Sequence, residues 1–199
     1  MRYLLTQSLL NSWLYQYKCF DGYEDQAHQS FLDTLNRKRS PTTDAQQRGI
    51  DFESMVYDIC DKKGDVSNKW YESASKIADS VRGARRQFVG MKNITVSGVD
   101  LLLYGRFDAL KAGVIYDIKF TTKYSVGKFF DSPQHPMYME ILPEANEFTY
   151  LVSNGSHVWS ETYRKDEIKP ITDTIEAFFE YLDAARLTDV YRDKWKSRK

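Results

Sequence analysis

The stretch from Tyr104 to Tyr138 constrains the fold more than any other part of this 199-residue chain. An apolar run ends at Asp108, Ala112-Gly113 follows as a turn signal, and a second apolar run leads into Asp117-Ile118-Lys119. This order predicts an antiparallel hairpin with polar side chains on both strands. Side chains alternate between the two faces of a strand, so Asp117 and Lys119 share one face while Ile118 points into the core.

Two carboxylates would meet in this hairpin. As a cross-strand neighbour, Asp108 is expected about 5 Å from Asp117. Carboxylates that close repel each other unless a cation lies between them, and oxygen ligands with an open coordination shell suit Mg²⁺ or Mn²⁺. Lys119, on the same face, is positioned to hold or activate a water beside the metal, or to neutralise charge on a phosphate.

Three short motifs follow one another in and after the hairpin. They are Gly105-Arg106-Phe107-Asp108, Asp117-Ile118-Lys119, and the pair Gln134 and Tyr138, which would lie one turn apart on a helix. Upstream, Gly49 is followed four residues later by Glu53. In this order the motifs resemble the PD-(D/E)XK nuclease superfamily, specifically its RecB-like and lambda-exonuclease-like branch. A glutamate in the first motif resembles the lambda-exonuclease type, whereas many RecB-like nucleases use histidine there.

The resemblance implies a fold and a reaction. The fold would be α+β with a restriction-endonuclease-like core, in which helices flank a central mixed sheet of about five strands. The reaction would be metal-dependent hydrolysis of DNA phosphodiesters. Exonuclease activity on DNA ends, in phage-type recombination or repair, is favoured over endonuclease activity.

The resemblance also assigns roles to individual residues. One or two Mg²⁺ or Mn²⁺ ions would be held by Glu53, Asp108, Asp117 and the backbone carbonyl of Ile118. Lys119 would orient the attacking water. Gln134 and Tyr138 would brace the site or contact the phosphate of the substrate.

Affinity for DNA has to come from local patches, because 28 Lys and Arg residues balance 28 Asp and Glu residues. A helix expected over 68–88 would carry Arg82, Arg85 and Arg86 on one face, a candidate grip for DNA phosphates. A solvated basic turn that interacts with the helix dipole is an equally good interpretation. The basic end of the chain could add non-specific attraction through Lys194, Lys196, Arg198 and Lys199.

Cys19 and Cys60 are the two cysteines, and no charged-then-apolar leader precedes them. Two cysteines do not make a disulfide framework, so a reduced cytoplasmic setting is expected. They also cannot supply the four thiolates of the iron–sulfur cluster that some members of this branch hold. No apolar run approaches the length of a membrane span, so no membrane partner is expected.

A single domain over 1–199 is expected, with a helical part over 1–90, a sheet core over 91–165 and a helix over 170–199. Gly49 lies inside a predicted helix, where glycine costs about 1 kcal/mol relative to alanine, so a close approach to the sheet or to substrate is expected there. His135 is expected to be a polar helix residue. Further helices are expected at 6–17, 24–37, 42–61 and 123–130, and strands at 94–96, 99–108, 114–122, 147–152 and 157–163.

Three other functions stay open at this point. A catalytically weak nucleic-acid-binding module could keep the same fold, and a structure-selective endonuclease could use the same residues. A purely structural hairpin with coincident acids is the third. No surface pattern identifies a subunit interface, so the oligomeric state is also open.

Overall fold

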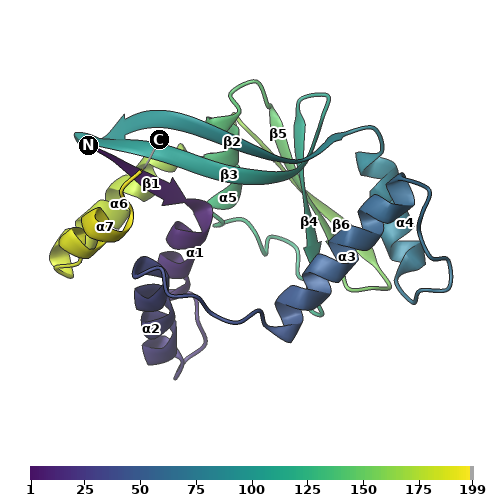
Figure 1. The fold of residues 1–199 in the computed structure, drawn as a ribbon, viewed down its shortest axis with the longest axis horizontal. Helices are drawn as coiled ribbons and strands as arrows, with labels where there is room; N and C mark the ends of the chain where they lie inside the picture. Colours follow the sequence, from purple (N-terminus) through teal and green to yellow (C-terminus); the bar gives the residue numbers. More distant parts are fainter. Residues whose placement is uncertain (198–199) are drawn as a thin grey trace.

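The protein folds around a mixed sheet of six strands, seen in a computed structural model that describes residues 1–197 (Figure 1). The central strand is β3, which pairs with β2 along one edge and with both β1 and β4 along the other. Two of the pairings, β1 with β3 and β4 with β5, are parallel. The strands are β1 (Arg2–Thr6), β2 (Arg85–Val96), β3 (Val99–Lys111), β4 (Val114–Phe120), β5 (Glu147–Ser153) and β6 (Val158–Arg164).

Helices cover the sheet on two sides, which is the α+β architecture that the sequence predicts. Three of them, α1, α5 and α6, pack on one face of the sheet, whereas α3 and α4 pack on the opposite side of β4 and β5 (Figure 1). The helices within residues 1–197 are α1 (Gln7–Tyr15), α2 (Glu24–Leu35), α3 (Asp44–Cys60), α4 (Tyr71–Val81), α5 (Gln134–Ile141), α6 (Ile171–Ala184) and α7 (Thr188–Lys194).

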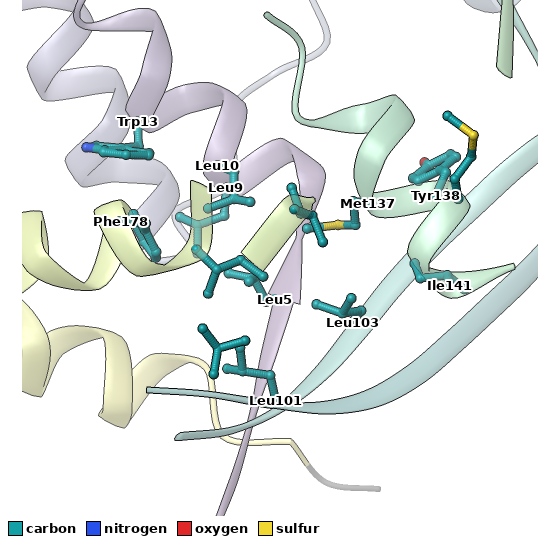
Figure 2. Close-up of a cluster of buried hydrophobic side chains, with 14 of the residues drawn as sticks. Leu5, Leu9, Leu10, Trp13, Leu101, Leu103, Met137, Tyr138, Ile141 and Phe178 are labelled. Carbon is teal, nitrogen blue, oxygen red and sulfur yellow. The ribbon is translucent and has the colours of Figure 1, made fainter. Parts of the chain in front are cut away.

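The larger hydrophobic core lies between the sheet and helices α1, α5 and α6 (Figure 2). The α1 helix begins after Thr6, whose hydroxyl accepts a hydrogen bond from the Leu9 amide, as the capping preference of threonine predicts. Apolar residues at helical spacing on α1 and α6 are buried. Those labelled in Figure 2 are Leu9, Leu10, Trp13 and Phe178, and Leu101 and Leu103 of β3 belong to the same core.

A smaller core lies between β4, β5 and the pair α3 and α4. The α3 helix begins at a capping box between Thr43 and Gln46, close to the predicted start, and buries Phe52 and Val56 against the sheet side that carries Ile118. Of the two approaches expected at Gly49, the one to the sheet is wrong, since a Cβ built there would meet no atom of the described residues within 4 Å. The approach to substrate stays a prediction.

Two glycines face each other across β2 and β3 and let α5 approach the sheet. Gly90 and Gly105 are paired in the register. A Cβ on Gly105 would lie 2.9 Å from the Tyr138 ring, and one on Gly90 would lie 2.8 Å from Ile141. These distances are too short for a side chain at either position. The glycine at position 105 is therefore required for steric reasons.

Two boundaries differ from the sequence predictions. The region 1–90 was expected to be helical, but Arg2–Thr6 form β1, which pairs in parallel with β3, and β2 begins at Arg85. The sheet has six strands, where about five were expected. The helix expected to reach residue 88 ends at Val81, because Gly83 adopts a φ of 76° and β2 starts at Arg85. A left-handed glycine after a helix is a common stop signal.

The remaining corrections concern loops and the C-terminal end. Residues 123–130 form turns rather than a short helix, and α7 is separate from α6 because Arg186 adopts a φ of 58° between them. The predicted contribution of Arg198 and Lys199 lies outside the described residues. Within residues 1–197, no helix is both long and apolar enough to cross a membrane.

Candidate active site

The β3–β4 hairpin forms at the predicted turn and then separates at the two acids. Ala112 and Gly113 both have positive φ, at 51° and 79°, as a two-residue turn between twisted strands requires. The ladder ends at the pair Ala109 and Tyr116, so Asp108 and Asp117 are the next residues on each strand. Beyond that pair a side-chain contact replaces the backbone hydrogen bonds between the two strands, because Asp108 Oδ2 accepts a hydrogen bond of 2.8 Å from the Ile118 amide.

Asp117 lies at the centre of the site. Its side chain is buried, and Oδ1 accepts a hydrogen bond of 2.5 Å from the Gln134 amide group. The Lys119 Nζ lies 2.7 Å from Oδ2 as an ion-pair partner. Apart from this ion pair, Oδ2 has no hydrogen-bond partner among the described residues. A carboxylate oxygen can accept more than one contact, so Oδ2 keeps acceptor capacity for a further ligand beside Lys119.

The surroundings of Asp108 and Asp117 disfavour the state in which both carboxylates are ionised without a bound cation. Burial raises the pKa of Asp108 well above its usual range, and the charges of Asp117 and Glu53 add to this. Burial also raises the pKa of Asp117, against the opposing effect of the Lys119 amine. Burial alone would lower the pKa of Lys119, but the two aspartates outweigh it and raise that pKa. A cation bound beside the pair would favour the ionised carboxylates.

Glu53 reaches the site from α3 through a tyrosine. The Tyr57 hydroxyl lies 2.9 Å from Glu53 Oε1 and 3.0 Å from the Asp108 carbonyl oxygen, so it bridges the helix and the strand. Burial and the surrounding acids raise the pKa of Tyr57, which keeps the hydroxyl protonated as a donor. The sequence prediction missed this residue, although its place one turn after Glu53 on the same helix face was a usable signal.

Gln87 is the second residue that sequence reasoning missed. It stands opposite Asp108 between the pairs Arg86–Ala109 and Phe88–Phe107, and its φ of 45° is unusual for a residue that is not glycine. Its amide group donates to Glu53 Oε1 at 2.9 Å. Such backbone conformations gather at functional sites. The sequence carries no signal for it, because its role depends on strand register.

The expected metal ion can be compared with the oxygen donors at the site. Asp108 and Asp117 offer carboxylate oxygens, the ligand type that Mg²⁺ and Mn²⁺ take, and one of these oxygens is the buried Asp117 Oδ2 beside Lys119. Within residues 1–197, however, no three His, Cys, Asp or Glu side chains are placed so that they could hold a metal ion by themselves. Mg²⁺ is often bound by one or two carboxylates, with waters and substrate phosphates completing its shell, so two aspartates fit this ion.

Gln134 and Tyr138 lie one turn apart on α5, as expected, and both act through other residues. Gln134 fixes the orientation of Asp117, as described above. The Tyr138 hydroxyl donates to the Arg106 carbonyl oxygen at 2.9 Å, and its ring packs on Phe107 with centroids 4.5 Å apart. Only 5% of Tyr138 is exposed, so it holds β3 against α5 rather than presenting its ring to solvent.

The predicted arginine patch is wrong. Arg82 follows the last residue of α4 and pairs with Asp79 at 3.1 Å, whereas Arg85 and Arg86 are consecutive residues of β2 and so point to opposite faces. Arg86 pairs with Asp61 at 2.6 Å, an interaction that raises the pKa of the guanidinium. Because the helix ends early, the three arginines do not form one phosphate-binding surface.

His135 is buried, which differs from the expectation of a polar helix residue. Its ring stacks on Tyr163 with centroids 4.1 Å apart, and Nδ1 lies 3.2 Å from the Tyr150 hydroxyl. Burial lowers the pKa of His135 to about 4. This imidazole is therefore neutral at physiological pH and belongs to the packing behind Gln134.

We expect the buried histidine to make stability sensitive to acid. Its folded-state pKa lies below the value of about 6.5 in an unfolded chain, so protonation favours unfolding. The contribution is fully present above pH 6.5 and is lost as the pH falls towards 4. Between pH 7 and pH 4.5 the free energy of unfolding should fall by about 2–3 kcal/mol more in the wild type than in His135→Phe. Urea unfolding at the two pH values measures this, and equal losses in both proteins would contradict it.

Comparison with known proteins supports the fold alone. No protein-family model and no curated protein matches the sequence. Among solved structures, the one described as the crystal structure of SSO0001 has 11% identity and a TM-score of 0.52, over 91% of this chain and 77% of that chain. The crystal structure of Scheffersomyces stipitis Rai1 aligns with 92% of this chain and 61% of its own length, at 13% identity and a TM-score of 0.33. The second score is too low to establish a shared fold.

Proposed function

We propose that this protein is a metal-dependent DNA phosphodiesterase of the PD-(D/E)XK type, with exonuclease activity favoured. One observation carries the proposal. Apart from its ion pair with the Lys119 amine, the buried Asp117 Oδ2 has no hydrogen-bond partner among the described residues, and Asp108 stands at the next position of the neighbouring strand. An acid pair with an adjacent amine suits the handling of phosphate charge better than any structural role in a hairpin, where burial of these groups costs stability.

Each residue of the site has a separate task in this proposal. Asp108 and Asp117 would hold Mg²⁺ or Mn²⁺, with Glu53 at the margin and, by the resemblance, the Ile118 carbonyl. When bound, the ion would act as a Lewis acid and lower the pKa of a coordinated water. The Lys119 side chain is about one third exposed, at 33%, so its amine can reach a phosphate oxygen or a water as well as Asp117.

The remaining groups keep the acids in place. Gln134 holds Asp117 in one rotamer, and Tyr57 links Glu53 to the backbone at Asp108. Tyr138 secures the strand that carries Asp108 through the Arg106 carbonyl. Fixed donors and acceptors of this kind reduce the reorganisation needed when charge develops on a phosphate.

The direct test is digestion of end-labelled linear DNA and of circular DNA, each with Mg²⁺ and with Mn²⁺. An exonuclease degrades the linear form progressively and leaves the circle intact, whereas cleavage of the circle would favour the structure-selective endonuclease. Asp108→Asn should be inactive. Asp58→Asn, an exposed acid on the same helix as Glu53, is the matched control and should retain activity.

A second candidate is a nucleic-acid-binding module with weak or no catalysis. The observation that favours it is the lack, within the described residues, of three acidic side chains arranged around one ion. This candidate predicts DNA binding that does not depend on divalent metal and no hydrolysis under any of the four conditions above.

We expect divalent metal to stabilise the folded protein. A ligand that binds only the native state at about 100 times its dissociation constant adds about 2.7 kcal/mol, which for a chain of this size raises the melting temperature by about 5–10 °C. Thermal unfolding with Mn²⁺ and with a chelator measures the shift. Asp108→Asn should lose it and Asp58→Asn should keep it. No shift in the wild type at millimolar Mn²⁺ would contradict the metal site.

A further inference from the structure

A groove lies over β1, β2 and β3, on the side of these strands away from the larger hydrophobic core, and residues of α7 line one edge of it. Its volume is about 440 Å³. The floor comes from three adjacent strands, since Leu4 of β1 pairs with Leu102 of β3, and Met91 of β2 pairs with Tyr104 of β3. Leu101 and Leu103 enter the core on the helical side, so Leu102 and Tyr104 face the groove.

The floor is apolar and aromatic, and part of it is exposed to solvent. Met91 is 42% exposed, and Val89, two residues away on the same face of β2, is 46% exposed. Tyr104, on the middle strand β3, adds an aromatic side chain to the floor. Apolar residues gathered in this way on a sheet face mark a binding surface more often than isolated exposed residues do.

One wall of the groove is basic and fixed in position. It carries Arg37, Lys194 and Lys196 against a single carboxylate, that of Asp193. The wall is tied to β1, because the Leu4 amide donates to the Trp195 carbonyl at 2.7 Å and Tyr3 forms a bridge with Lys196.

Arg37 is held in the same wall. Its guanidinium donates to the Lys194 carbonyl at 3.3 Å and lies 4.6 Å from the centre of the Trp195 ring. The lysine amines lie 3.1 Å and 3.7 Å from Asp193, which offsets only part of their charge. In a chain without net charge, this local excess of cations complements a polyanion.

The groove leads towards the candidate active site. Arg106 lies two residues beyond Tyr104 and therefore on the same face of β3. Its guanidinium donates to Gln87 Oε1 at 2.9 Å, and the Gln87 amide group donates in turn to Glu53. From Tyr104 to Asp108 the strand advances about 13 Å, the length of a few nucleotides.

We propose that this groove binds a single strand of DNA that enters or leaves the active site, with bases on the apolar floor and phosphates along the basic wall. The identity of the bound polymer as substrate rests on the proposed function. A duplex keeps its base faces stacked inside and could not use the floor, whereas unpaired bases stack on aromatic rings regardless of sequence. The floor therefore selects a single strand over a duplex.

The test is fluorescence anisotropy with a labelled 12-nucleotide single strand and the matching duplex, in a chelator so that no hydrolysis occurs. The wild type should bind the single strand at least tenfold more tightly than the duplex. Tyr104→Ala should weaken single-strand binding about tenfold, and Tyr104→Phe should restore it. Lys194→Gln with Lys196→Gln should reduce the slope of log affinity against log salt by about 1.4, because each phosphate that a lysine neutralises adds about 0.7 to that slope.

Lys62→Gln with Lys63→Gln, two exposed lysines after α3, is the matched control and should bind like the wild type. Thermal melting confirms that each variant is folded. Two results would overturn the proposal that the groove binds a single strand. One is equal affinity for duplex and single strand, and the other is unchanged binding by Tyr104→Ala and by the Lys194 and Lys196 variant. If the protein hydrolyses DNA but gives either of these two results, the proposed function is unaffected. Single-strand binding through the groove without any hydrolysis would overturn only the proposed function.

Discussion

Asp117→Asn will reduce DNA hydrolysis by about a thousandfold or more without destabilising the metal-free protein. Asparagine keeps the shape of the side chain and can still accept the Gln134 hydrogen bond through its oxygen. It removes the anionic oxygen at the position of Oδ2, which is the atom that the metal and Lys119 would share. Losses of this order follow the removal of one preorganised electrostatic group from an active site.

The stability outcome has its own physical basis. Burial raises the pKa of Asp117, which means that its charge is disfavoured in the folded state. A neutral amide avoids that penalty, so the metal-free variant should melt at the same temperature or higher. Initial rates on linear DNA with Mn²⁺ and melting curves in a chelator are the two measurements. Retention of more than a tenth of the wild-type rate would remove Asp117 from the mechanism.

Gly105→Val will destabilise the fold by about 1–3 kcal/mol. A Cβ at this position would lie 2.9 Å from the Tyr138 ring and 3.2 Å from Ile141, so α5 must move away from the sheet. That movement breaks the hydrogen bond between the Tyr138 hydroxyl and Arg106, and it shifts Gln134 relative to Asp117. Activity should therefore fall along with stability.

The matched control is Gly49→Ala, where an added Cβ meets no atom within 4 Å and the residue lies inside α3. Relieving the helix penalty of glycine should stabilise the protein by about 1 kcal/mol. Urea unfolding of both variants gives the two free energies. The steric explanation of Gly105 would be contradicted if its valine variant unfolded at the wild-type urea concentration.

The parts of the fold that depend on local signals could be predicted from the sequence. The Ala112-Gly113 turn and the alternation around Asp117 predicted the central hairpin, and the helices expected at 6–17 and 42–61 start close to the observed starts of α1 and α3. The missed strand β1 has five residues and pairs with a strand almost a hundred residues later. Neither the length nor the composition of this strand predicts such a non-local parallel pairing.

The same distinction between local and non-local signals applies to the candidate site. The acids, Lys119 and the α5 pair carry short motifs, so they could be located in the sequence, whereas Tyr57 and Gln87 act through strand register and helix packing. The arginine patch was wrong because Arg82, with a ψ of 126°, and Gly83, with a φ of 76°, form a turn that ends α4 before Arg85 and Arg86. Arg85 and Arg86 then lie on two faces of a strand instead of one face of a helix.

A crystal structure of the protein soaked in Mn²⁺, with anomalous diffraction recorded for that ion, tests the central claim most directly. The account predicts a manganese peak at bonding distance from Asp117 Oδ2, with Asp108 on the same ion and Lys119 beside it. A peak at another place, or none at that oxygen under saturating Mn²⁺, would contradict the proposed metal-dependent chemistry.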